Sequence, residues 1–149
     1  MTEQLSPLAL QALAVVKESG AIIGANHAHP HTIRHKGRID LVTETDIAVE
    51  AFLKERLATL APQAGFLAEE SAEDLSLPDT CWIIDPVDGT TNFAHGLPLT
   101  VTSVAYRLNG EIVLGIVNAP LLRECFIAEK GKGAWRNGER ISVSSVTAC

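Results

Sequence analysis

The run from Cys81 to Asn92 constrains the fold more than any other stretch of this chain. Its apolar segment, Trp82 to Ile84, has the length and composition of a short buried strand. Pro86 has no backbone N–H group, so we expect the sheet ladder to end before it. The two carboxylates of the run, Asp85 and Asp88, are therefore predicted to lie together at the end of a strand.

A turn suited to anions follows the two carboxylates. Gly89 permits a tight turn, and the backbone amides of Thr90, Thr91 and Asn92 can open a helix. The N–H groups in the first turn of a helix have no partner within the helix, and they favour an anion. The run therefore combines carboxylates for a metal ion with amides for a phosphate group.

Glu69, Asp85 and Asp88 are the candidate metal ligands. Carboxylate oxygens, without a Cys-x-x-Cys pair or a spaced histidine pair, favour Mg²⁺, Mn²⁺ or Ca²⁺ over zinc. The segment Gly65 to Ala68 resembles a buried strand, so Glu69 is expected to emerge at a sheet end as Asp85 does. Two plainer interpretations stay open: the Asp-Pro-Val-Asp-Gly sequence also suits a surface turn, and a Glu-Glu pair also suits a solvated loop end.

Three segments in a consistent order resemble the inositol monophosphatase family. The longest is Trp-Ile-Ile-Asp-Pro-Val-Asp-Gly-Thr-Thr-Asn-Phe-Ala-His-Gly-Leu-Pro at 82–98. Asp-Leu-Val-Thr-Glu-Thr-Asp at 40–46 resembles the upstream acidic motif of the family, and Phe-Leu-Ala-Glu-Glu-Ser at 66–71 resembles its Glu-Glu motif, with Ala68 where a glycine is usual. The resemblance covers the first half of the family pattern. The later Trp-Asp motif, which supplies another metal-binding aspartate, is absent from the sequence.

The resemblance implies a metal site with two or three Mg²⁺ ions, for which Mn²⁺ can substitute and which Li⁺ or Ca²⁺ inhibits. It assigns Glu69 to the ion that activates the attacking water and Asp85 to a position bridging ions. Asp88 would hold the ion that stabilises the leaving alkoxide, and the carbonyl of Val87 would be a further ligand. Glu70 would support this set.

The resemblance also implies a catalytic hydroxyl. Asp46 would accept a hydrogen bond from Thr90, whose hydroxyl orients the attacking water. The amides of Gly89 and Thr90 would bind phosphate oxygens. A plainer role for Asp46 is open as well, since it lies three positions after Thr43, close to the spacing of a helix capping box.

Two further residues take supporting positions by the same resemblance, Thr91 beside the catalytic threonine and Lys36 on a mobile loop near the site. On the sequence alone, a solvated lysine beside Gly37 is the better explanation of Lys36.

Composition narrows the class of protein. The 149 residues suffice for one domain, and 46% of them are hydrophobic. A formal charge of −6 without basic clusters argues against binding to nucleic acid or to an anionic membrane. Cys81, Cys125 and Cys149 form neither a disulfide framework nor a zinc site, so we expect a reducing, cytoplasmic location. The apolar stretch from Pro7 to Val16 is too short to span a bilayer.

The pattern of elements predicts an α+β fold in which two helices pack on a largely antiparallel sheet. A helix is expected from Pro7 to about Gly24, and a second one after Thr43, ending before Pro62. The segment 27–37 is a connection with room for one short hairpin. Two Asn-Gly pairs, at 109–110 and 137–138, are typical of type I′ hairpin turns joining strands 101–108 with 111–117 and 133–136 with 139–143.

Together these observations predict the N-terminal, metal- and phosphate-binding half (1–149) of a layered α-β-α-β-α sugar-phosphatase domain. By resemblance, the function is Mg²⁺-dependent hydrolysis of inositol monophosphate or a related sugar phosphate, by direct attack of water on phosphorus, in a protein that is a homodimer when complete. The alternative is a non-catalytic half-domain, or one subunit of a split enzyme, that binds metal or a partner protein.

Overall fold

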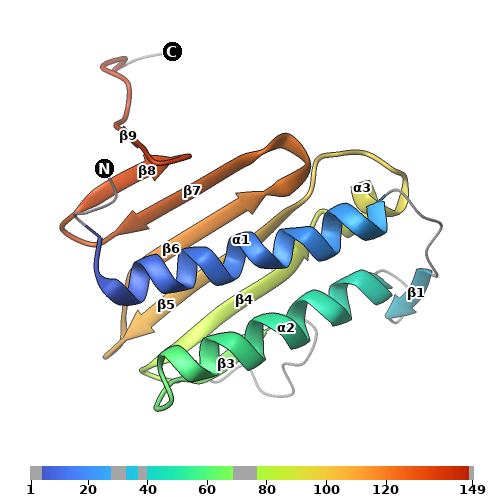
Figure 1. Cartoon of the computed structure of the whole chain (residues 1–149), viewed down its shortest axis with the longest axis horizontal. Helices are drawn as coiled ribbons and strands as arrows, with labels where there is room; N and C mark the ends of the chain where they lie inside the picture. The colour runs from blue at the N-terminus through green and yellow to red at the C-terminus, as the bar shows by residue number, and fades with distance from the viewer. Residues whose placement is uncertain (1–4, 28–32, 37–39, 69–76, 148–149) are drawn as a thin grey trace.

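The computed structural model describes residues 5–27, 33–36, 40–68 and 77–147, with the backbone alone described at 33–36 and 40–43. Two long helices cover one face of a seven-stranded sheet, and a separate two-stranded hairpin precedes the second helix (Figure 1). The predicted α+β class, two helices on a largely antiparallel sheet, is confirmed.

The sheet is a meander in which neighbours in space are neighbours in sequence. Its strands are β3 (Gly65–Ala68), β4 (Cys81–Asp88), β5 (Val101–Leu108), β6 (Glu111–Ala119), β7 (Glu124–Glu129), β8 (Gly133–Arg136) and β9 (Glu139–Ile141). β3 and β4 are parallel, and every other pair is antiparallel. The remaining elements are α1 (Pro7–His27), the hairpin β1 (Ile33–Lys36) and β2 (Asp40–Thr43), α2 (Glu44–Leu60), the short α3 (Thr90–Ala94) and the 3₁₀ turn η1 (Pro120–Leu122).

Both predicted Asn-Gly turns are present. Asn109 and Gly110 have φ of 50° and 84°, and Asn137 and Gly138 have φ of 50° and 85°. Two consecutive left-handed residues give a turn whose twist matches that of the flanking strands. The second hairpin is shorter than expected, since β9 ends at Ile141.

The sequence analysis missed β7, the strand that joins the two hairpins into one sheet. Its six residues alternate between buried positions, such as Cys125 and Ile127, and more accessible ones. The strand is too short, and too polar at its glutamate ends, for that alternation to stand out. Arg123, the residue between η1 and the start of β7, has a left-handed conformation with φ of 57°.

The core lies between the helices and one face of the sheet. A row of buried side chains crosses five adjacent strands at paired positions, namely Ile84, Val104, Ile116, Ile127 and Trp135. The helices approach this row closely. A Cβ atom on Gly20 would lie 2.8 Å from the Asn118 side chain and 2.9 Å from Pro120, so only glycine allows α1 this approach to β6 and η1.

The helix α1 is three residues longer than the expected end near Gly24, because nothing in its last turn breaks a helix. By length and composition it could cross a membrane. In the structure it packs on α2 and the sheet, with Ala12, Val16 and Ile23 fully buried.

The opposite face of the sheet carries small residues and is not covered by any helix of the described part of the chain (Figure 1). Ala105, Gly115, Ala128 and Ala134 occupy paired positions across four strands. We call the surface formed by these four residues the floor. Two shallow grooves lie on it, one of about 250 Å³ towards Ile141 and one of about 400 Å³ towards Ile112.

A carboxylate fixes the start of α1. The Ser6 hydroxyl accepts a hydrogen bond from the backbone N–H of Ala9 at 3.2 Å, as an N-cap does. The backbone N–H of Ser6 donates to Glu129 of β7 at 2.8 Å. Partial burial alone raises the pKa of the Glu129 carboxyl, but hydrogen bonds from the Ser6 backbone and side chain, with the charge of Lys132, outweigh it and leave the pKa below its ordinary value.

This cap predicts an acid-sensitive contribution to stability. A carboxyl whose pKa is lowered by folding stabilises the protein fully above its unfolded pKa, close to 4.5, and loses that contribution as the pH falls through the lower folded value. Glu129→Gln should therefore flatten the decrease in the free energy of unfolding below pH 4.5, measured by urea titration at stepped pH. Glu139→Gln, an exposed change on β9, is the control, and equal pH slopes in wild type and Glu129→Gln would contradict the assignment.

Candidate metal and phosphate site

A β-bulge in β4 places the two central carboxylates on one face of the sheet. Asp85 pairs with Ser103 and Asp88 pairs with Val101, so β4 uses one residue more than β5 over this interval. In a regular strand, residues three apart point to opposite faces. The extra residue cancels that alternation, because Ser103 and Val101 share a face. Asp85 is half-buried and Asp88 is exposed.

The bulge corrects the expectation that Pro86 ends the strand. β4 continues to Asp88, and Pro86 lies inside the irregular interval, where a missing N–H group is tolerated. The Thr102 hydroxyl, fully buried, donates a hydrogen bond of 2.9 Å to the Pro86 carbonyl. This bond fixes the backbone between the two carboxylates, including the buried Val87.

Gly89 forms the predicted turn after β4 in a left-handed conformation, with φ of 90°. A Cβ atom here would lie 2.7 Å from the Leu99 carbonyl oxygen, so the position requires glycine for two reasons. α3 begins directly afterwards at Thr90, and no side chain caps its first turn. Asn92 ties α3 to the next loop, since its side chain donates to the Leu99 carbonyl at 2.9 Å.

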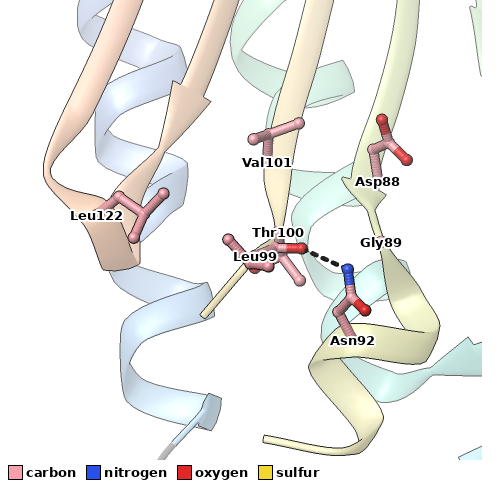
Figure 2. Close-up of a pocket in the computed structure, with 7 residues that line it drawn as sticks. All are labelled: Asp88, Gly89, Asn92, Leu99, Thr100, Val101 and Leu122. Carbon is pink, nitrogen blue, oxygen red and sulfur yellow. Dashed lines mark hydrogen bonds between the residues drawn. The ribbon is translucent and has the colours of Figure 1, made fainter. Parts of the chain in front are cut away.

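A cavity of about 320 Å³ opens beside this turn. Figure 2 shows its lining, which comes from β4, α3, the start of β5 and η1: Asp88, Gly89, Asn92, Leu99, Thr100, Val101 and Leu122. Thr100 is 1% exposed, and its hydroxyl has no hydrogen-bond partner in the described part of the chain. A buried hydroxyl without a partner costs free energy, and a polar ligand in the cavity would satisfy it.

Asp46 lies in the first turn of α2 and is 1% exposed. The starts of α2 and of α3 lie at the same end of the sheet as the bulge (Figure 1). Thr90 is half-buried and Thr91 exposed. The hydrogen bond from Thr90 to Asp46 stays a prediction, and so does the water-orienting role of Thr90.

Of three further candidate residues, Glu69, Glu70 and Lys36, the structure describes only the backbone of Lys36. Glu69 and Glu70 lie outside the described residues. β3, which leads to them, is parallel to β4 and pairs Ala68 with Ile84, one residue before Asp85. Lys36 pairs with Asp40 in the hairpin of β1 and β2, and its side chain is outside the description.

The donor atoms suit a hard divalent cation. Two carboxylates share a face, one of them half-buried, and a backbone carbonyl lies between them. Oxygen ligands of this kind select Mg²⁺ or Mn²⁺ over softer metals. Within the described ranges no group of three His, Cys, Asp or Glu residues comes together, so these two carboxylates are the part of the metal site that can be tested against the structure.

Cysteine chemistry is not favoured here. Burial raises the pKa of the Cys81 and Cys125 thiols, which keeps them protonated at neutral pH. Both thiols are free and buried.

Two residues that shape the site escaped the sequence analysis, Thr100 and Thr102. Both lie in a segment whose β-branched residues simply suggest a strand. One signal could have found them. Thr100 and Thr102 are polar residues at buried positions, at and just before the start of the strand that pairs with the proline-containing strand β4.

Comparison with known proteins identifies relatives over nearly the whole chain. A family model described as the inositol monophosphatase family matches residues 4–149. The inositol monophosphatase of Dictyostelium discoideum is 48% identical over 139 residues, which cover 91% of this chain and 51% of that protein. The chain spans about half the length of the curated relatives it matches.

Solved structures show the same fold. The extragenic suppressor protein suhB from Bartonella henselae superposes with a TM-score of 0.87 at 33% identity, over 95% of this chain and 56% of that one. A staphylococcal inositol monophosphatase-1, solved as a lithium chloride-soaked inhibitory complex, superposes with a TM-score of 0.77 at 27% identity, over 86% of this chain and 49% of that one.

The bond from Thr102 to Pro86 predicts that metal binding depends on a residue that does not face the metal. Thr102→Val removes the hydroxyl and leaves the Pro86 carbonyl buried without this donor, which should cost about 1–3 kcal/mol of stability. The shift of the unfolding midpoint by Mg²⁺ should shrink as well, because the two carboxylates are no longer held on one face. Thermal unfolding with and without saturating Mg²⁺ measures both effects.

Thr102→Ser keeps the hydroxyl and is the matched control. It should retain the Mg²⁺-dependent shift. An unchanged shift in Thr102→Val would contradict the role of the bulge.

Proposed function

The chain belongs to the inositol monophosphatase family, and on that premise we propose that it is the metal- and phosphate-binding half of a Mg²⁺-dependent phosphomonoesterase. The substrate is inositol monophosphate or a related sugar phosphate, and water attacks phosphorus directly. The observation that carries the proposal is the bulge that brings Asp85 and Asp88 to one face, beside the Gly89 turn and a cavity of about 320 Å³.

The proposed metal ligands are Glu69, Asp85, Asp88 and the Val87 carbonyl. When bound, two or three Mg²⁺ ions supply Lewis-acid stabilisation of the charge on phosphate and lower the pKa of water. The carboxylates fix where these charges lie. A half-buried Asp85 holds its position better than an exposed side chain, and the exposed Asp88 at the cavity would hold the ion that stabilises the leaving alkoxide.

The proposed phosphate contacts come from the turn itself. The left-handed Gly89 directs the backbone towards the cavity without a Cβ atom in the way, and the first amides of α3 are not capped by a side chain. The Thr90 hydroxyl then orients the attacking water, and Asp46 accepts a hydrogen bond from that hydroxyl. Asp46 is buried, so this hydrogen bond would be shielded from solvent. A hydrogen bond is stronger in such surroundings than in water.

Substrate choice, lithium or calcium inhibition and a homodimeric complete protein belong to the proposal through the family alone, and the cytoplasmic location belongs to it through the cysteine pattern. The lithium complex of the staphylococcal relative supports the second of these. We expect no role in binding nucleic acid or membranes, given the formal charge of −6.

The first experiment measures phosphate release from inositol 1-phosphate by the complete protein, of which this chain is the proposed metal- and phosphate-binding half. Activity should require Mg²⁺ and disappear in excess chelator. Asp88→Asn removes a ligand charge while keeping the shape, and Thr90→Ala removes the hydroxyl. The latter should lower kcat by about 10²–10⁴ if Thr90 takes part in general-base chemistry.

Two controls accompany these variants. Thr90→Ser keeps a hydroxyl and should recover part of the activity. Glu55→Gln removes a carboxylate charge from the exposed side of α2, away from the site, and should leave kcat unchanged. Phosphate release that persists in chelator would reject the mechanism, and near-native turnover of Thr90→Ala would reject the role of Thr90.

A second candidate function is supported by the open face of the sheet. The floor of Ala105, Gly115, Ala128 and Ala134 admits close packing, and Val117 and Ile112 beside it are 38% and 48% exposed. Exposed apolar surface of this kind favours association. The chain would then act as one subunit, or a non-catalytic half, that binds a partner polypeptide corresponding to the other half of its relatives.

This candidate predicts that the 149-residue chain alone is a poor catalyst and self-associates through the open face. Ala128→Glu places a charge on the floor and should restore a monomer in light-scattering chromatography. Ala51→Glu, on the exposed side of α2, is the control and should not. Adding the second half of a relative as a separate polypeptide should raise turnover. A wild-type chain that is monomeric and fully active alone would contradict this prediction.

A further inference from the structure

The last turn of α1 contacts the start of α2. The Asn26 side chain donates a hydrogen bond of 3.0 Å to the hydroxyl of Thr45. Thr45 is fully buried, and Asp46 follows it directly in the first turn of the helix. This contact therefore lies one residue away from the carboxylate proposed to accept a hydrogen bond from Thr90.

The same turn also contacts α3. His27 Nε2 lies 3.2 Å from the Gly96 carbonyl oxygen. Because a carbonyl can only accept, His27 donates from Nε2. The His27 ring also packs against the buried Phe93, with 5.8 Å between ring centroids. These contacts hold the C-terminal end of α3, the helix that begins at Thr90.

α3 needs such support because it is five residues long. A helix this short has almost no stability of its own, so its orientation depends on contacts with the rest of the protein. Its start is held by Gly89 and by the bond from Asn92 to Leu99. Its other end rests on His27. Figure 1 shows the end of α1 beside α3, at the end of the sheet where α2 begins.

We propose that Asn26 and His27 form a brace that sets the position of Asp46 relative to Thr90. The brace rests on the proposed function, since that function requires these two residues to be aligned. Asp46 lies on α2 and Thr90 lies on α3. The last turn of α1 contacts both of these helices. Asn26 and His27 are positioning residues, because they act through Thr45, Phe93 and Gly96 and touch neither metal nor substrate.

The brace predicts a loss of turnover rather than of substrate binding. An error of about 1 Å between reacting groups can cost roughly 10²-fold in rate, while contacts to the phosphate are unaffected. Asn26→Ala removes the donor to Thr45. His27→Phe keeps a ring against Phe93 but removes the N–H group. Each should lower kcat about tenfold and leave KM within about twofold.

The combination of the two variants distinguishes a brace from two local contacts. If both residues fix one relative position, losing either one releases it, so the double variant should lose little more than a single variant. If the two effects are unrelated, the two fold-losses in kcat would multiply in the double variant. Ala25→Ser, an exposed change in the same turn, is the control and should leave kcat unchanged. His27→Gln retains a donor for Gly96 and should recover part of the turnover.

Turnover is measured on the full chain, with the second-half polypeptide added if the chain alone is too slow. Hydrogen exchange of the chain itself gives a readout that does not need activity. Each single variant should speed exchange at the amides of both 44–47 and 90–94. Exchange that changes only in the element contacted by the mutated residue would overturn the brace, and so would unchanged kcat in both single variants or full multiplication in the double variant.

Failure of the proposed function looks different. The proposed function would be rejected if the wild-type chain shows no Mg²⁺-dependent phosphatase activity, either alone or with the second-half polypeptide added. Hydrogen exchange would then decide on the brace alone: linked changes at both elements support it, and isolated changes overturn it.

Discussion

The buried hydrogen bond from Thr102 to the Pro86 carbonyl is the interaction on which the arrangement of the site depends. It stabilises one extra residue in β4, and that residue reverses the side on which Asp88 would otherwise lie. Without it, Asp85 and Asp88 would face opposite sides of the sheet, and one of them would point into the apolar layer under the helices. A hydroxyl in the core thus determines the geometry of charges on the surface.

The two faces of the sheet have different tasks. One face carries the row from Ile84 to Trp135 and receives α1 and α2. The other carries the bulged carboxylates at one end and small residues along its middle. The last turn of α1 also lies at the end with the candidate site, where Asn26 contacts α2 and His27 contacts Phe93 of α3. The core and the candidate site are therefore coupled through α1.

Much of the fold could be predicted from the sequence because local signals were strong: the helix start at Pro7, the Asn-Gly turns, and the apolar strand before Asp85. The bulge could not, since a proline gives the same signal whether it ends a strand or sits within an irregularity. β7 was missed because six residues hold too little periodicity. At the candidate site, the sequence indicated the charged candidates and Thr90, but not Thr100, Thr102 or the end of α1, whose roles come from contacts between distant segments.

The meander has a consequence for the order of folding. Each strand pairs with its neighbour in sequence, so most of the sheet can form through short loop closures. The helix α1 is different, since Asn118 bonds to the Val16 carbonyl across 102 residues of chain. Closing so long a loop is entropically costly until the sheet exists to receive the helix. We expect α1 to dock late, through the notch at Gly20, so that the end of the molecule with the candidate site is the last part to become rigid.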